Sequence, residues 1–235
     1  MKAVLFDFGG TLDTDGVHWS EMCWEYYRRY HIDVPKPAYE KAFVASDLGL
    51  MDDPGVTRCT FHETLRKQFF LQFSILGINS RGSDVARMAD DCYADVQQTI
   101  AKAKSILKAL KPNYALGIVS NFYGNLNIVC KEFGLDELFE AMIDSRVVGI
   151  KKPDPAIFTI ALKKLGVRAV DAFVVGDSYE RDIVPGKSLG CRTIWLKGKS
   201  WKVAPATEAA DYSIERFEDI RNILVETGIQ NEINR

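Results

Sequence analysis

The sequence predicts an α/β protein: a parallel β-sheet with helices on both faces, and an all-helical domain inserted after the first strand. Two observations lead to this prediction. Short apolar runs rich in Val, Ile and Phe alternate with helical segments, which is typical of a parallel sheet whose strands are buried on both faces. Residues 16–98, between the first two runs, show helical patterns only. With 235 residues, 47% of them hydrophobic, the chain is long enough to bury such a core.

The predicted strands are short runs with little polar alternation. The clearest runs lie at residues 3–6, 115–119, 172–175 and 193–196, and weaker ones lie at 141–143 and 212–214. Helices are expected between and after them, at residues 101–110, 125–133, 156–165, 182–189 and 218–226. Gly134 and Gly166 follow two of these helices, where a helix end favours a left-handed residue.

The inserted block is expected to contain helices at residues 18–30, 38–48, 60–73 and 84–99, separated by prolines and glycines. We therefore predict a core domain formed by residues 1–15 and 99–235 and a helical cap formed by residues 16–98. The aromatic side chains of the cap are expected to form its packed interior rather than a ligand site. They are Trp19, Trp24, Tyr26, Tyr27, Phe61, Phe69, Phe70 and Phe73.

The composition argues against two classes of partner. Lys and Arg total 30 against 32 Asp and Glu, so a formal net charge of −2 gives no electrostatic basis for general binding to nucleic acid or to a membrane surface. No apolar run approaches the roughly 18 residues of a membrane span, and the chain reaches Asp7 too early for a signal peptide. The five cysteines are scattered without a CxxC pair, which indicates free thiols in a reducing compartment. We therefore expect a cytoplasmic protein.

Polar and charged residues follow the predicted strands, and the carboxyl ends of parallel strands meet at one edge of a sheet. They lie in Asp7-Phe8-Gly9-Gly10-Thr11, Ser120-Asn121, Lys151-Lys152-Pro153 and Gly176-Asp177, with Asp182 one helical turn later. An Asp on such a loop can attack phosphorus as a nucleophile. Three crowded carboxylates repel one another and need a cation such as Mg²⁺, which prefers oxygen ligands. Because a hydroxyl, a lysine and loop amides would stabilise a transferring phosphoryl group, the set favours phosphoryl-transfer chemistry.

In the order and placement of these segments, the sequence resembles the haloacid dehalogenase-like (HAD) hydrolase superfamily over nearly the whole chain. Asp7-x-x-Gly10-Thr11-Leu12 is similar to the first motif of the family, and Ser120 after an apolar run is similar to the second. Lys152-Pro153-Asp154-Pro155 and Gly176-Asp177-(x)4-Asp182 resemble the third and fourth motifs. The resemblance implies a Rossmann-like parallel core and identifies the inserted block as a helical cap of the type called C1.

The resemblance also implies a role for each matched residue. Asp7 would be the nucleophile and, with the Gly9 carbonyl and Asp177, a ligand of Mg²⁺. Asp182 would complete the metal site by holding a metal-bound water, or would orient Lys152, the lysine directly before the proline. The expected phosphate-binding residues are Gly10, Thr11, Ser120, Asn121 and Lys152. The implied activity is Mg²⁺-dependent hydrolysis of a small phosphorylated metabolite through an aspartyl-phosphate on Asp7.

One departure from the family pattern concerns acid–base catalysis. Family phosphatases usually carry a second Asp two residues after the nucleophile, and here that residue is Gly9. General acid–base help is typically worth about 10²–10⁴-fold, so its loss should slow the hydrolysis of alkyl esters. Asp13, Asp15 or His18 could take over this role, or the substrate could have a good leaving group.

Two other functions stay open at this point. The protein could be a non-catalytic binding or regulatory protein on the same scaffold, because Gly9 removes the usual acid. Dehalogenation is less favoured, because the dehalogenase branch resembles DxYGT in its first motif and lacks the acid pair that this chain keeps as Asp177 and Asp182. The sequence carries no motif that identifies the substrate or the oligomeric state.

Overall fold

The computed structural model describes residues 2–78, 82–200 and 210–224. Within them, a six-stranded sheet has the order β3-β2-β1-β4-β5-β6, and every neighbouring pair is parallel. The strands are β1 (Lys2–Phe6), β2 (Tyr114–Ser120), β3 (Ala141–Asp144), β4 (Ala172–Gly176), β5 (Arg192–Leu196) and β6 (Tyr212–Ile214). The predicted fold class is confirmed, and each predicted strand lies within an observed one.

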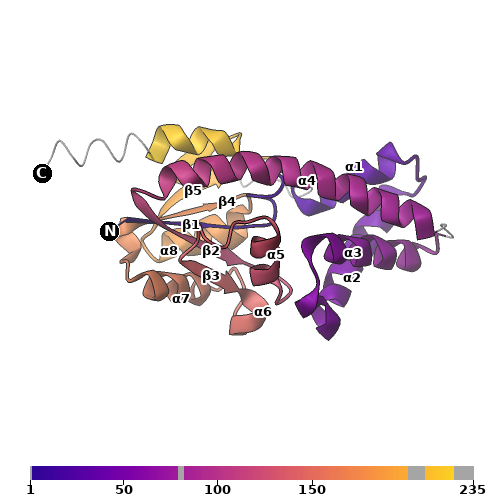
Figure 1. The fold of residues 1–235 in the computed structure, drawn as a ribbon, viewed down its shortest axis with the longest axis horizontal. Helices are drawn as coiled ribbons and strands as arrows, with labels where there is room; N and C mark the ends of the chain where they lie inside the picture. Colours follow the sequence, from indigo (N-terminus) through magenta and orange to yellow (C-terminus); the bar gives the residue numbers. More distant parts are fainter. Residues whose placement is uncertain (1, 79–81, 201–209, 225–235) are drawn as a thin grey trace, which may run out of the picture.

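The strand order reverses at β1, which lies between β2 and β4 (Figure 1). The strands β2 and β3 lie on one side of β1, and β4, β5 and β6 lie on the other. The loops that follow β1, β2 and β4 therefore meet at the carboxyl edge of the sheet. This is the position at which open parallel sheets bind ligands. The predicted site residues on these three loops are therefore neighbours in space.

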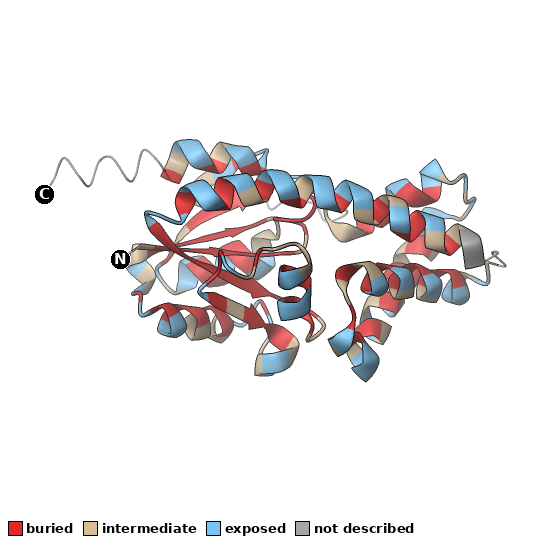
Figure 2. Ribbon diagram, viewed as in Figure 1, coloured by how far each residue is buried: buried red, intermediate tan, exposed pale blue. Residues whose placement is uncertain are grey.

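Different helices cover the two faces of the sheet. Val4 and Phe6 belong to one apolar cluster, together with side chains from α4 (Gly82–Leu110), α5 (Leu126–Glu132) and the C-terminal residues 217–224. Ala3 and Leu5 belong to a second cluster with α7 (Ala156–Leu165). Because both faces of the central strands are buried, as Figure 2 shows, β1, β2 and β4 are apolar with little alternation.

The remaining short elements lie between the strands or, for η4, after the last one. They are α6 (Ser145–Val148), η2 (Ala169–Asp171), a π-helical turn η3 (Tyr179–Ile183), α8 (Val184–Ser188) and η4 (Phe217–Asp219). The helix predicted at residues 182–189 therefore begins earlier and is divided into η3 and α8. Residues 225 and 226 of the predicted last helix lie outside the described residues. No helix in the described part of the chain is long and apolar enough to cross a membrane.

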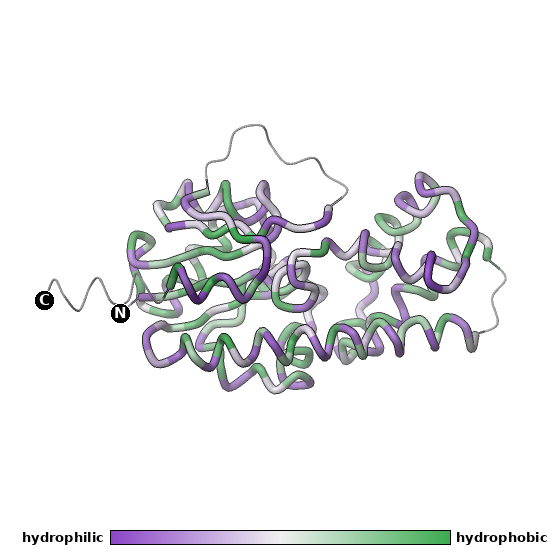
Figure 3. The backbone as a smooth tube through the Cα atoms, turned by 90° about the horizontal axis from the view of Figure 1, so that it is seen from above, coloured by the Kyte–Doolittle hydropathy of each residue, from purple (hydrophilic) through white to green (hydrophobic). Residues whose placement is uncertain are grey.

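The segment between β1 and β2 is helical, as predicted, and extends away from the sheet (Figures 1 and 3). It contains α1 (Trp19–Arg29), α2 (Lys36–Asp52), η1 (Pro54–Arg58), α3 (Phe61–Leu76) and the first part of α4. Most of its aromatic side chains are buried, but the prediction for Phe70 was wrong, because this side chain is 64% exposed.

The two helices predicted at residues 84–99 and 101–110 are one helix, α4, of 29 residues. At 1.5 Å per residue it is roughly 43 Å long, and it runs from the inserted segment onto the sheet (Figure 1). The prediction of a break was wrong because Val96, Ile100 and Ala103 keep helical spacing across it and are all buried. Since α4 passes through residues 98 and 99 without interruption, the domain boundary at this point stays a prediction.

Candidate active site

The loop that carries Asp7 begins directly after β1. Asp7 continues the sheet, because its backbone N–H donates to the carbonyl of Val175 at 2.9 Å. The chain then turns through Gly10, whose φ of +91° is in the left-handed region. A Cβ atom at Gly10 would lie 2.4–2.5 Å from the carboxylate of Asp177, so a side chain here would displace that carboxylate. Gly10 thus allows the loops after β1 and β4 to approach each other.

The Asp7 carboxylate is held by one of its two oxygens. Oδ1 accepts hydrogen bonds from the backbone N–H of Phe8 at 2.7 Å and from the Ser120 hydroxyl at 2.9 Å. The same oxygen lies 2.8 Å from Nζ of Lys152. These three polar contacts of the Asp7 carboxylate are therefore all made to Oδ1. Oδ2 is the oxygen that Asp7 can present to a substrate.

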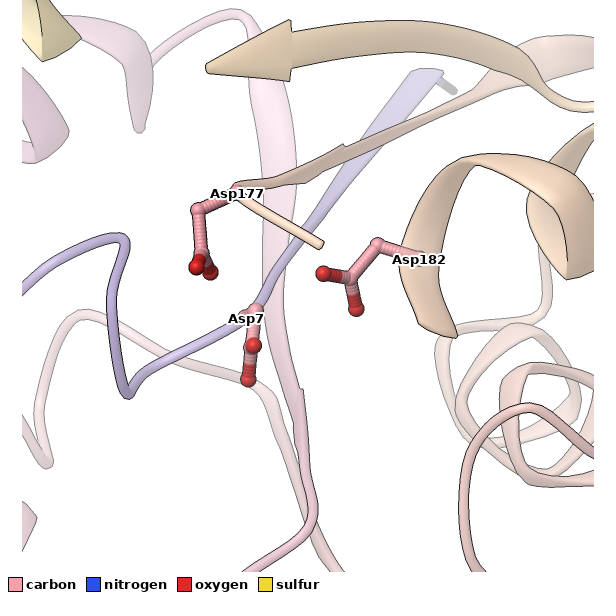
Figure 4. Close-up of side chains that lie close together, drawn as sticks. All are labelled: Asp7, Asp177 and Asp182. Carbon is pink, nitrogen blue, oxygen red and sulfur yellow. The ribbon is translucent and has the colours of Figure 1, made fainter. Parts of the chain in front are cut away.

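Three carboxylates converge at this edge of the sheet. Figure 4 shows Asp7, Asp177 and Asp182 pointing towards one another, and one oxygen of each lies within 4.8 Å of the others. Burial raises the pKa of Asp177 and of Asp182, and the negative charge of Asp7 raises both further. This arrangement of oxygen donors fits a divalent cation such as Mg²⁺, because the cation would compensate the crowded negative charge.

Lys152 supplies the positive charge that these carboxylates contact in the structure. Its Nζ lies 2.6 Å from Asp182 and 2.8 Å from Asp7, and its side chain is 1% exposed. Burial acts to lower the pKa of Lys152, but the charges of Asp182 and Asp7 outweigh it, so the pKa is raised and the ammonium form persists. The neighbouring Lys151 is exposed.

Asn121 and Thr11 lie at the site but use their side chains to brace other site residues. The Asn121 amide donates to the carbonyl of Lys152 at 3.0 Å and accepts from the N–H of Lys152 at 2.8 Å. The Thr11 hydroxyl donates to Oδ1 of Asp177 and accepts from its N–H, both at 3.1 Å. These contacts fix the positions of Lys152 and Asp177.

The sequence did not indicate a role for Trp195, at the end of β5. Its indole N–H donates to the backbone carbonyl of Asp177 at 2.9 Å. Tyr179 packs edge-on against the indole, with 5.1 Å between ring centroids, and Lys197 lies over its face at 5.1 Å. Trp195 therefore holds the backbone of a carboxylate residue of the site. The available signal in the sequence was only its place at a strand end.

The structure also shows what surrounds Gly9, where the family pattern has an Asp. A Cβ atom at Gly9 would lie 3.5–3.6 Å from the indole of Trp19, the first residue of α1. The same indole donates its N–H to Asp13 at 2.8 Å, and the other oxygen of Asp13 accepts from the N–H of Gly10. Burial raises the pKa of Asp13 to about 7. This carboxyl is fully buried, and each of its oxygens already accepts a hydrogen bond.

The other two residues considered as substitute acids are also engaged elsewhere. Asp15 accepts a hydrogen bond from the backbone N–H of Phe217 at 2.6 Å. His18 caps the N-terminus of α1, where its Nδ1 accepts from the N–H of Ser20 at 3.2 Å. Neither contact directs the side chain towards Asp7.

Comparisons with known proteins agree with the fold and the site. A family model described as haloacid dehalogenase-like hydrolase matches residues 1–190. Glyceraldehyde 3-phosphate phosphatase from Pyrococcus furiosus is 34% identical over 139 residues, which cover 56% of each chain. Pyrophosphatase PpaX from Bacillus velezensis is 30% identical over 143 residues, covering 59% of this chain and 60% of the relative. This chain thus matches little more than half the length of these relatives.

Solved structures extend the likeness of the fold over the whole chain. The HAD phosphatase from Thermococcus onnurineus superposes with a TM-score of 0.57 and 23% identity, covering 95% of this chain and 98% of the other. The 2-haloacid dehalogenase from Pseudomonas syringae pv. Tomato gives a TM-score of 0.54 at 21% identity, covering 97% and 99%. With its parallel sheet, its converging acidic loops and the family model matching residues 1–190, this chain belongs to the haloacid dehalogenase-like hydrolase family.

Proposed function

We propose that the protein is a Mg²⁺-dependent phosphatase that hydrolyses small phosphorylated metabolites through a phosphorylated Asp7. The observation that supports this proposal most directly is how the two oxygens of the Asp7 carboxylate are bonded. Its Oδ1 is fixed by Ser120 and Lys152, so Oδ2 is oriented for attack while Asp177 and Asp182 stand beside it. The curated relatives named as phosphatases and pyrophosphatase support the same chemistry.

In the first step, Oδ2 of Asp7 attacks phosphorus and the bond from phosphorus to the ester oxygen breaks. The leaving group departs with the bonding electron pair and takes a proton from solvent. Lys152 and the Ser120 hydroxyl, already within 2.9 Å of Oδ1, would also bind the oxygens of the transferring group and stabilise its charge. The loop amides beyond Gly10 would add further donors.

In the second step, water attacks the phosphorus of the acyl phosphate. The bond between phosphorus and Oδ2 breaks, inorganic phosphate leaves, and the carboxylate of Asp7 is restored. The proton released by the water passes to solvent, because Gly9 offers no carboxylate that could accept it as a general base. We therefore expect the enzyme to act best on substrates with good leaving groups, such as acyl phosphates and diphosphates.

The metal site and the helical segment complete the proposal. Asp7, Asp177, Asp182 and the carbonyl of Gly9 would hold Mg²⁺, which when bound neutralises charge on the phosphoryl group. Residues 16–98 would act as a cap that excludes bulk water from the site. We also place the protein in the cytoplasm, since its five cysteines are free thiols.

The test is release of phosphate from p-nitrophenyl phosphate and acetyl phosphate, with Mg²⁺ and with EDTA. We expect turnover by the wild type with Mg²⁺, its loss in EDTA, and its loss in Asp7→Asn. Asp52→Asn, at an exposed position of α2, is the matched control and should behave as the wild type. Absence of release from both compounds would overturn the proposal in favour of ligand binding without chemistry, or of dehalogenation.

A further inference from the structure

The helical segment places one acidic side chain above the loops of the candidate site. Asp47 lies on α2, and its Oδ1 accepts a hydrogen bond from the hydroxyl of Tyr123. Tyr123 is in the loop after β2, three residues beyond Ser120, whose own hydroxyl donates to Asp7. The pair of Asp47 and Tyr123 therefore joins α2 to a loop of the site.

The packing of Phe122 brings this pair close to the nucleophile loop. Phe122, adjacent to Tyr123, contacts Phe8 edge-on, with 5.4 Å between ring centroids. Phe8 is the residue after Asp7, and its backbone N–H donates to the Asp7 carboxylate. The loops that carry Tyr123 and Asp7 are thus packed against each other.

The positive charge of Arg181 also acts on Asp47. Burial raises the pKa of Asp47, and the Tyr123 hydroxyl and the guanidinium of Arg181 oppose that rise. Arg181 lies in η3, directly before Asp182 of the carboxylate cluster. Asp47 therefore interacts with Tyr123, from the loop that carries Ser120, and with the charge of Arg181, which precedes Asp182.

Hydrogen bonds between the helical segment and the sheet loops fix this arrangement. Nη1 of Arg146, in α6, donates to the carbonyl of Asp53 at 3.1 Å and to that of Tyr123 at 3.2 Å. The Asn125 amide donates to the carbonyl of Cys59 at 2.9 Å. The end of α2 is thereby tied to the same loop that carries Tyr123, so the position of Asp47 is set by the core.

These side chains can be reached by a ligand. Asp47 and Tyr123 are partly exposed and Arg181 is exposed, whereas Asp13, the other acid near the nucleophile loop, is fully buried. A molecule whose phosphoryl group meets Asp7 would extend its other end towards the three accessible groups.

We propose that Asp47, Tyr123 and Arg181 form the subsite that binds the leaving group of the substrate, and that this subsite selects small, neutral polyhydroxy compounds. The inference rests on the proposed phosphatase function. The other oxygen of Asp47 and the phenol oxygen of Tyr123 can accept hydrogen bonds from hydroxyl groups, while the guanidinium of Arg181 can donate to hydroxyl oxygens. A leaving group with its own carboxylate would meet the like charge of Asp47, and an apolar one would make none of these hydrogen bonds.

The experiment measures binding separately from the slow turnover expected for alkyl esters. Glycerol 1-phosphate and phosphoglycolate are used as competitive inhibitors of p-nitrophenyl phosphate hydrolysis, and their inhibition constants are compared between variants. We expect Asp47→Asn to raise the inhibition constant of glycerol 1-phosphate about tenfold or more, which is the usual effect of losing a hydrogen bond to a charged group. The same change should lower the inhibition constant of phosphoglycolate, because it removes the repelling charge.

Two further variants make the result specific. Tyr123→Phe should weaken glycerol 1-phosphate in the same direction, and Asp52→Asn, on the exposed side of α2, should leave both inhibition constants unchanged. Changes below about twofold for both inhibitors in Asp47→Asn, with p-nitrophenyl phosphate still hydrolysed, would overturn the subsite. Absence of p-nitrophenyl phosphate hydrolysis by the wild type would instead overturn the proposed function, and the subsite with it.

Discussion

The buried ammonium group of Lys152 pairs with two of the three clustered carboxylates, Asp7 and Asp182, and replacing it with Met tests the charge balance of the site. Met keeps much of the length of the side chain and removes the charge. Asp7 and Asp182, at 2.8 and 2.6 Å from Nζ, would then face each other and Asp177 without a nearby cation. Removing one partner of a buried ion pair typically costs about 3–5 kcal/mol, because the other charge is left uncompensated.

For a chain of this size, about 1 kcal/mol corresponds to about 2–4 °C in Tm. We therefore expect Lys152→Met to lower Tm by about 10 °C in EDTA. Addition of Mg²⁺ should raise the Tm of the variant by more than it raises that of the wild type, because the cation then replaces a missing charge. The assay is thermal unfolding followed by circular dichroism at about pH 8.

Lys151→Met is the matched control, since Lys151 is adjacent in sequence but exposed. A surface substitution of this kind should change stability by only about 0.5 kcal/mol. If Lys152→Met melts within about 2 °C of the wild type in EDTA, or gains no more from Mg²⁺ than the wild type does, the charge balance inferred for the site is wrong.

Three shorter predictions concern residues around the site. Trp195→Phe removes the donor to the Asp177 carbonyl but keeps an aromatic ring, and should weaken Mg²⁺ binding about 10–100-fold by calorimetry with Tm little changed; unaltered affinity would contradict this positioning role. Gly9→Asp should be accommodated, because the new Cβ would lie 3.5–3.6 Å from the Trp19 indole, an ordinary van der Waals contact, and it should speed alkyl phosphate hydrolysis by restoring the missing carboxylate; an unchanged or lower rate with the fold intact by circular dichroism would contradict this. Burial raises the pKa of Asp13 to about 7 from about 3.9 in an unfolded chain, so its contribution lowers stability as pH rises from about 4 to 7; Asp13→Asn should make the fall of Tm over that range shallower, and an unchanged slope would refute it.

Much of the fold could be predicted from the sequence, because the central strands β1, β2 and β4 are buried on both faces and their apolar runs are local signals. The residues that follow the strands could be placed together for the same reason: parallel strands bring their carboxyl ends to one edge. Asp7, Ser120, Lys152 and Asp177 were found in this way, and their geometry supports the roles proposed for them.

The contacts between distant elements could not be predicted. Trp19 looked like one more aromatic of a helical core, but its indole covers Gly9 and bonds to Asp13. Asp47 had no distinguishing pattern, and its meeting with Tyr123 depends on how α2 is docked on the sheet loops. Such contacts depend on how distant elements pack against each other. No hydrophobic periodicity at Trp19 or Asp47 indicates these contacts in the sequence.

The continuity of α4 sets how the helical segment can move. This helix contains no Pro or Gly after Gly82, so it has none of the residues at which helices usually bend, and it connects the segment to the sheet as a stiff rod. The other connection is the short stretch between β1 and α1, which includes Gly9, Gly10 and Gly16. If α4 tilts relative to the sheet, the backbone of that stretch must change, and the same stretch carries Asp7. If the helical segment tilts, the orientation of the Asp7 carboxylate would change with it, so a ligand bound beneath the helices would also reorient the proposed nucleophile.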